Sequence, residues 1–190
     1  MADELHPLAE RNKFPWQLAD AQFMRGWLAV QEGDFENGIK LMTELAGKAG
    51  GAGAAFGPMY TILIIEEELR GGYVERALAR IERSIDEMNV KANRFCAPEL
   101  FRLRGEALWA QARPYNAEAE RAFREALALS RKQSCRPLEL RAASSLARLL
   151  RDSGRAAEAR DLLAPVYGAF TEGFERPDLQ AAKALLAELR

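Results

Sequence analysis

Apolar residues recur every three or four positions along most of this chain, which is the spacing of one buried face of an α-helix. Strict alternation of apolar and polar residues, the mark of a half-buried strand, is not sustained anywhere, and Val and Ile are few. The pattern therefore predicts an all-α protein whose helices come in consecutive pairs. The first helix of each pair is expected at Trp16–Gln31, Met59–Leu69, Glu99–Gln111 and Leu138–Arg151, and the second at Phe35–Lys48, Val74–Met88, Ala117–Lys132 and Ala156–Tyr167.

Five prolines indicate an internal repeat of about 40 residues. They lie 43, 40, 39 and 40 residues apart, and each opens a helical stretch, where a missing amide hydrogen costs nothing. In every repeat a small residue is also followed, one helical turn later, by a large apolar one, which indicates a seam of close helix packing. The prolines are Pro15, Pro58, Pro98, Pro137 and Pro177, and the pairs are Gly38 with Met42, Ala77 with Ile81, Ala119 with Phe123, and Ala159 with Leu163.

Polar or glycine-bearing turns separate the two helices of each pair, so each repeat is predicted to be an antiparallel helical hairpin. Asp3–Asn12 has the pattern of a second helix whose first helix is missing, and Asp178–Leu189 has that of a helix capping the array. The expected fold is a right-handed α-solenoid forming a single domain, residues 1–190. Its parts are a partial hairpin helix at 1–14, hairpin repeats at 15–57, 58–97, 98–136 and 137–176, and a C-terminal capping helix at 177–190.

The repeats resemble tetratricopeptide (TPR) repeats, in which a small residue in the first helix and a turn glycine precede Ala-x3-Phe in the second. The best matches are Gly26 with Gly33, Gly105 with Ala119 and Phe123, and Ala147 with Gly154 and Ala159. The chain departs from the family in its period, which exceeds the usual 34 residues, in the loss of most first-helix Trp and Tyr residues, and in Ile65, which stands where a small residue is expected.

Residues 98–108, 117–123, 139–147 and 161–174 resemble the C-terminal repeat region of large bacterial signalling ATPases, including those that carry a nucleotide cyclase or a DNA-binding module. The catalytic parts of that family are absent from these residues. The resemblance therefore implies an interaction or regulatory arm, either as a segment of a larger chain or as a small stand-alone relative.

The amino-acid composition limits the kinds of partner that the protein is expected to bind. The 190 residues hold 27 Lys and Arg and 28 Asp and Glu, so a net charge of -1 favours neither nucleic acid nor an anionic membrane. The charge is uneven, however: residues 1–90 carry 9 basic and 15 acidic groups, whereas residues 91–190 carry 18 and 13. Two cysteines, one histidine and no export or membrane-spanning segment favour a cytoplasmic protein without a zinc site or a disulfide framework.

No residue pattern supports catalysis, a metal or a cofactor. The glycine-rich stretch Gly47–Gly57 lacks the spacing of a phosphate loop and is expected to be a loop between repeats. His6 has no partner nearby in sequence, and Cys96 and Cys135 are expected to be half-buried thiols rather than a redox pair. The run Glu66–Glu68 points in three directions around a helix, which favours a solvated face.

The first helices of stacked hairpins line a concave groove, and helical spacing predicts which side chains point into it. We expect Arg to recognise carboxylates there and Trp to supply apolar area. The alternative is that the tryptophans belong to the core and the arginines solvate a helix face. The predicted groove residues are Phe23, Trp27, Glu66, Arg102, Glu106, Trp109, Arg141, Ser144 and Arg148.

The favoured function is a non-catalytic module that binds a protein or peptide segment in this groove, with an acidic end of the partner near Arg102, Arg141 and Arg148. Two alternatives stay open: a ligand-sensing regulatory arm of a larger signalling ATPase or cyclase, and a self-associating module that forms homo-oligomers.

Overall fold

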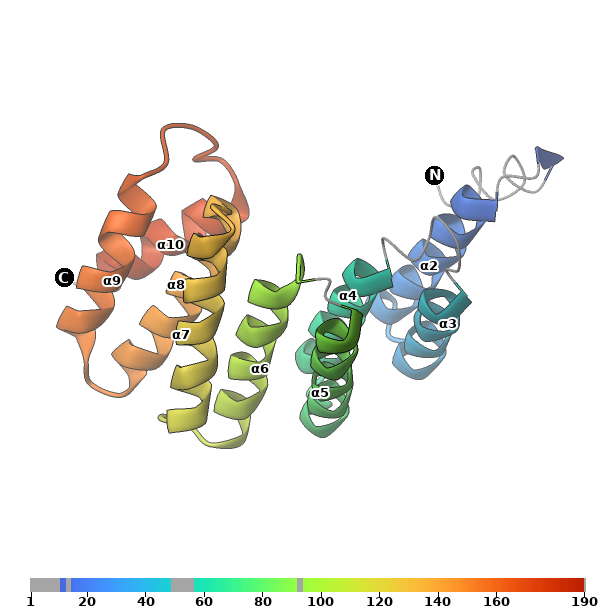
Figure 1. The fold of residues 1–190 in the computed structure, drawn as a ribbon, viewed down its shortest axis with the longest axis horizontal. Coiled ribbons are helices and arrows are strands. Elements are labelled where there is room, and N and C mark those ends of the chain that lie inside the picture. Colours follow the sequence, from blue (N-terminus) through green and yellow to red (C-terminus); the bar gives the residue numbers. More distant parts are fainter. Residues whose placement is uncertain (1–10, 13–14, 49–56, 92–93, 190) are drawn as a thin grey trace. The chain divides into compact units, whose positions relative to one another are not determined.

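The computed structural model describes residues 11–12, 15–48, 57–91 and 94–189, and within these ranges it contains nine helices and no strand. The chain forms two compact units, residues 1–77 and residues 78–190, and the boundary falls inside helix α5 (Figure 1). The all-α fold of antiparallel hairpins predicted from the sequence is confirmed. The helices are α2 (Pro15–Gln31), α3 (Phe35–Lys48), α4 (Gly57–Arg70), α5 (Val74–Lys91), α6 (Ala97–Gln111), α7 (Ala117–Lys132), α8 (Arg136–Asp152), α9 (Ala156–Gly168) and α10 (Pro177–Glu188).

Unit 1 is built on the α2–α3 hairpin, against which α4 packs through α3. Its two central helices touch at Gly26 and Gly38: a Cβ atom on Gly38 would lie 2.6 Å from the Gly26 carbonyl oxygen, and one on Gly26 would lie 2.9 Å from that of Gly38. A Cβ at either position would collide with the backbone of the other helix, so the two helices are in direct backbone contact here. The core beside this crossing consists of Phe23, Ile39, Met42, Leu45 and Ile64.

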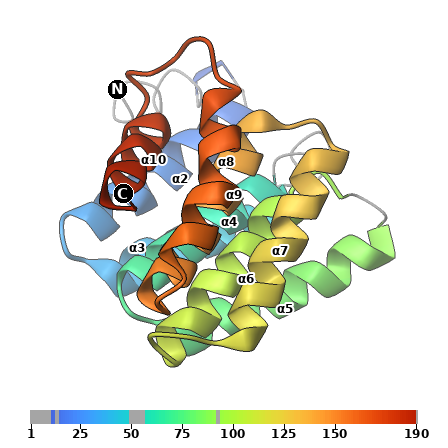
Figure 2. The same ribbon diagram turned by 90° about the vertical axis from the view of Figure 1, so that its left-hand side faces the viewer.

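Unit 2 contains the α6–α7 and α8–α9 hairpins, followed by α10, which packs on both α8 and α9 (Figure 2). Leu179, Ala182 and Leu185 of α10 are buried in the same core as the apolar faces of the two hairpins. This C-terminal helix therefore covers the apolar side of the last hairpin, as the sequence predicted.

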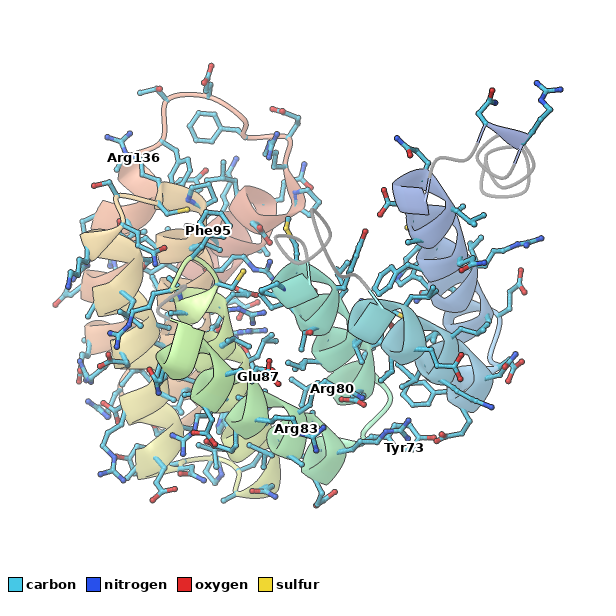
Figure 3. All side chains as sticks on the ribbon, turned by 45° about the vertical axis from the view of Figure 1, so that its right-hand side comes forward. Tyr73, Arg80, Arg83, Glu87, Phe95 and Arg136 are labelled. Carbon is cyan, nitrogen blue, oxygen red and sulfur yellow. The ribbon has the colours of Figure 1, made fainter. Side chains whose placement is uncertain are left out.

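Three of the four hairpin turns use a glycine in the left-handed conformation. Gly33, Gly72 and Gly154 have φ angles of 95°, 83° and 81°. In each turn the amide of the following residue bonds back to the last helical turn, as in Arg155 N–H to the Leu150 carbonyl at 2.8 Å. Figure 3 shows Tyr73 immediately after the second of these turns, where its ring stacks on Phe35 with centroids 4.2 Å apart.

The predicted helix bounds lie close to the observed ones, and all five prolines occupy the first or second helical position. Each small residue of the predicted seam is buried, as is the large residue one turn later: Ala77, Ala119 and Ala159 are fully buried, with Met42, Ile81, Phe123 and Leu163. The expectations for most of Asp3–Asn12, for His6 and for most of Gly47–Gly57 lie outside the described residues.

Candidate functional site

The two first helices of unit 2 carry a cluster of charged side chains. Glu99, Arg102 and Glu106 follow one another at three and four residues along α6, so they share one face of that helix. Arg141 and Arg148 lie two turns apart on α8, on the side that meets this face of α6. We call these five residues the charged face.

Its side chains form one continuous chain of ion pairs. Glu99 Oε1 accepts hydrogen bonds from Arg102 Nε at 2.9 Å and Nη2 at 2.5 Å, and it lies 3.0 Å from Arg141 Nη2. Glu106 Oε1 lies 3.5 Å from Arg102 Nη1 and accepts from Arg148 Nη2 at 2.5 Å and from Ser145 Oγ at 2.6 Å. Arginine and glutamate therefore alternate across two helices, and three guanidinium groups share two carboxylates.

Burial divides the charged face into two layers. Glu99 and Arg102 are only 4% and 7% exposed, whereas the side chains of Arg141 and Arg148 are 32% and 45% exposed. Two polar atoms near the buried layer, Glu99 Oε2 and Ser144 Oγ, are inaccessible and have no hydrogen-bond partner in the protein. Buried Glu99 holds the guanidinium group of Arg141, and half-buried Glu106 holds that of Arg148, while both groups remain partly open to solvent.

The first helices of unit 1 carry a different polar cluster. Glu67 of α4 accepts the indole N–H of Trp27 at 2.9 Å on one oxygen, and on the other it accepts Gln31 Nε2 at 3.2 Å and Arg70 Nη1 at 3.1 Å. Trp27 is half-buried, and its ring reaches from α2 to α4. Both carboxylate oxygens of a side chain only 4% exposed are thus occupied.

The solvated face expected for Glu66–Glu68 is wrong for two of its three residues. Glu67 and Glu68 are buried, and Glu68 pairs with Arg76 Nε at 3.1 Å; only Glu66 is half-buried. Consecutive residues on a helix point about 100° apart, so a helix packed on two sides can bury two neighbouring glutamates if each finds a cation or a donor.

Two predicted groove residues belong to the core. Phe23 is 2% exposed and stacks on Tyr60, with centroids 4.4 Å apart. Trp109 is 1% exposed, meets Phe123 edge-on and donates its indole N–H to the Pro114 carbonyl at 2.8 Å. Neither ring is available to a partner, whereas the Trp27 ring stays partly open.

Of the residues predicted to line the groove, Arg102, Glu106, Arg141 and Arg148 come together in one set of ion pairs, but Arg102 is buried rather than on the surface. The sequence reasoning missed Glu99 and Ser145, which complete the network, and in unit 1 Gln31, Glu67 and Arg70. The repeat period could have indicated several of these pairings. The hydrogen-bonded pairs Trp27–Glu67, Gln31–Arg70 and Glu106–Ser145 are 40, 39 and 39 residues apart, close to that period.

A further charged network lies on the second helices of unit 2. Glu120 of α7 accepts hydrogen bonds from Arg124 and from Arg155, and both arginines also pair with Glu158 of α9. Burial alone would raise the pKa of the Glu120 carboxyl, but the hydrogen bonds from Arg155, Arg124 and Tyr115 outweigh it and lower that pKa. This network ties α7 to α9.

The Tyr60 hydroxyl and the Cys96 thiol both have a raised pKa. Burial and the nearby Asp20 carboxylate, to which the hydroxyl donates a hydrogen bond, raise the pKa of Tyr60 to about 12. Burial and the Glu99 carboxylate raise the pKa of the Cys96 thiol, which disfavours the reactive thiolate at neutral pH. Cys96 and Cys135 are both half-buried free thiols, as expected.

None of the helices in the described part of the chain has the length and apolar character needed to cross a membrane. Within the same residues, no three His, Cys, Asp or Glu side chains come together as metal ligands do.

Among solved structures, the chain is similar to a candidate kinesin light chain from Podosopora anserina with nearly identical TPR-like repeats. The match has a TM-score of 0.65 at 20% identity and covers 90% of this chain and 84% of the other; the Q17M form of the same protein matches with a TM-score of 0.66 and the same identity and coverage. This likeness shows a TPR-like repeat fold. Neither a family model nor a curated protein matches the sequence.

Proposed function

We propose that this chain is a non-catalytic protein–protein interaction module that binds a peptide or protein segment on the surface of its first helices. TPR-like repeats generally serve as interaction modules, and stacked hairpins present extended binding surfaces. The observation that carries the proposal is the charged face, on which Arg141 and Arg148 stay open to solvent while buried Glu99 and half-buried Glu106 hold them in place.

The proposed partner segment carries a carboxylate where it meets α8. Three guanidinium groups against two carboxylates leave the charged face with one excess positive charge. Because the two outer arginines are already ordered by ion pairs, an incoming carboxylate does not have to immobilise long, flexible side chains. Arg102 takes no direct part, since it lies beneath the surface.

The test is affinity capture from an extract of the source organism with three forms of the chain: wild type, the double variant Arg141→Ala/Arg148→Ala, and Arg121→Ala. The last is the matched control, because Arg121 is an exposed arginine of α7, outside the charged face. We expect partners retained by wild type and control to be lost by the double variant and to elute at raised salt. Equal capture by all three forms would refute the proposed site.

We place this module in the cytoplasm of a bacterial cell, as an arm of a signalling protein, on the strength of the sequence resemblance and the low cysteine content alone.

A further inference from the structure

Unit 1 exposes large apolar side chains on its first helices. Met24 and Leu28 of α2, and Met59 and Leu63 of α4, are between 38% and 53% exposed. Each pair is spaced by four residues and so forms a strip along its helix. We call these four residues the Met–Leu patch. In unit 2 the described first helices α6 and α8 carry no large apolar side chain that is exposed to this degree.

The repeat itself shows that this exposure is unusual. Gly26 and Gly105 occupy equivalent places, since a Cβ on either would strike the large residue of the next helix, Met42 or Phe123. In α8 the equivalent position is Ala147. Met24 and Leu28 lie two residues before and two residues after Gly26. The residues at the same offsets in the other first helices are at most 2% exposed: Leu103 and Ala107 in α6, and Ser145 and Leu149 in α8.

A neighbouring helix contacts one of the counterparts in α8, Ser145. Helix α6 packs beside α8, and Glu106 of α6 accepts a hydrogen bond from Ser145. In unit 2 this row of positions therefore accommodates a helix lying alongside. Where the row is apolar, as in unit 1, the complementary surface is a helix with an apolar strip facing inward.

The Trp27 side chain bridges the two helices that carry the strips. Trp27 lies three residues after Met24, on the same side of α2, and its indole N–H bonds to Glu67, which lies one turn after Leu63 on α4. A half-buried aromatic ring therefore lies where α2 and α4 meet. Methionine side chains adapt to differently shaped apolar partners, and this property suits a docking surface.

Acidic groups outnumber basic ones in unit 1, although exposed Arg25 follows Met24 on α2. Residues 1–77 hold 7 basic and 12 acidic groups. On the strip of α2, exposed Asp20 lies one turn before Met24, and exposed Glu32 follows one turn after Leu28. On α4, half-buried Glu66 follows Leu63 by three residues. Opposite charges around an apolar centre select and steer a partner.

From this shape, apolarity and charge, we propose that the Met–Leu patch docks a basic amphipathic helix of a partner protein, with its apolar strip on the patch and its Lys or Arg residues toward Asp20, Glu32 and Glu66. The proposal extends the interaction function above to a second surface with the opposite charge preference.

The probe is a labelled peptide of about 17 residues, the length of α2, with a Leu strip at helical spacing and Lys elsewhere. Two comparison peptides replace every Lys by Glu or scramble the Leu positions. Fluorescence anisotropy is measured with wild-type chain, with Leu28→Ser/Leu63→Ser, and with Phe95→Ser. Phe95, just before α6 (Figure 3), is the matched control because it is an exposed apolar side chain of unit 2.

We expect the Lys peptide to bind wild type and Phe95→Ser equally, and to bind the double variant at least about tenfold more weakly. Both comparison peptides should bind wild type at least about tenfold more weakly than the Lys peptide does. Unchanged circular dichroism of the variants shows that folding is intact, since the replaced side chains are exposed.

Three results would overturn the proposal: equal binding of Lys and Glu peptides, equal weakening by Phe95→Ser, or no binding to wild type. Light scattering supplies a fourth, namely a dimer of the wild-type chain that Leu28→Ser/Leu63→Ser converts to monomer, because a second copy would then occupy the patch. None of these results affects the test of Arg141 and Arg148, so the two proposals fail separately.

Discussion

Glu99 organises the charged face because one of its oxygens is the acceptor for both Arg102 and Arg141. Helical spacing predicted the arginines on this surface but left their partners open, since pairing across α6 and α8 depends on how far one helix is shifted along the other. The same limit applies to Glu67, whose three donors come from two helices.

Removing Arg102 should destabilise the protein far more than removing Arg148. Arg102→Ala leaves the Glu99 carboxylate buried with only Arg141 for compensation, and loss of one partner of a buried pair costs about 3–5 kcal/mol. Arg148→Ala removes an arginine that is 45% exposed and should cost less than about 1 kcal/mol. Urea unfolding followed by circular dichroism measures both, with Arg121→Ala as control, and equal midpoints would contradict this account.

The Glu120 network should make stability fall in acid. Because the folded-state pKa of Glu120 lies below its unfolded value of about 4.3, the ionised carboxyl stabilises the fold above that pH. This contribution is lost as the pH falls through the lowered folded-state pKa. In Glu120→Gln the melting temperature should be lower at pH 7 and should change less between about pH 5 and pH 2.5. Glu125→Gln, an exposed glutamate of the same helix, should follow the wild-type curve.

At the scale of the helix, local chemistry determined most of what the sequence could predict. Proline at a helix start acts within one turn of the chain, so the first helices α2, α4, α6 and α8 begin within two residues of the expected positions. The burial of Phe23 and Trp109 was harder to predict. A side chain at the boundary of groove and core is buried or exposed depending on the angle and distance at which two helices pack, and the sequence does not give these.

Gly105→Ala should destabilise the α6–α7 hairpin. A Cβ at this position would lie 2.5 Å from Cδ1 of Phe123, a buried ring that cannot move aside, and overpacking typically costs about 1–3 kcal/mol. Gly168→Ala is the matched control, since no atom lies within 4 Å of its added Cβ. Thermal unfolding should show a lower midpoint for the first variant and an unchanged or higher one for the second; a raised midpoint in Gly105→Ala would contradict the close packing.

At the scale of the whole molecule, the two units differ in the size of their cores. Among the described residues, nine apolar side chains of unit 1 are buried, against 26 of unit 2. The even proline spacing runs across residue 77 without interruption, so the sequence carries no sign of this division. A periodic sequence pattern reveals that the chain is made of repeats, but it does not reveal how much apolar surface each repeat buries.

Unit 1 should therefore open more readily than unit 2. We expect the amides of α2 and α3 to exchange with solvent at least about tenfold faster than those of α7 and α8, because local opening is easiest where the least apolar surface is buried. Hydrogen exchange followed by mass spectrometry measures this difference, and uniform protection across both units would show that the two cores unfold together.

The crossing of Gly26 and Gly38 also constrains how this sequence can drift over generations. Each glycine is required because the carbonyl of the other stands where its Cβ would be. A replacement at either position forces α2 and α3 apart, and once they are apart the second glycine is no longer needed. The two positions should thus change together across descendants, and the distance between the two helices, rather than either residue, is the trait that is inherited.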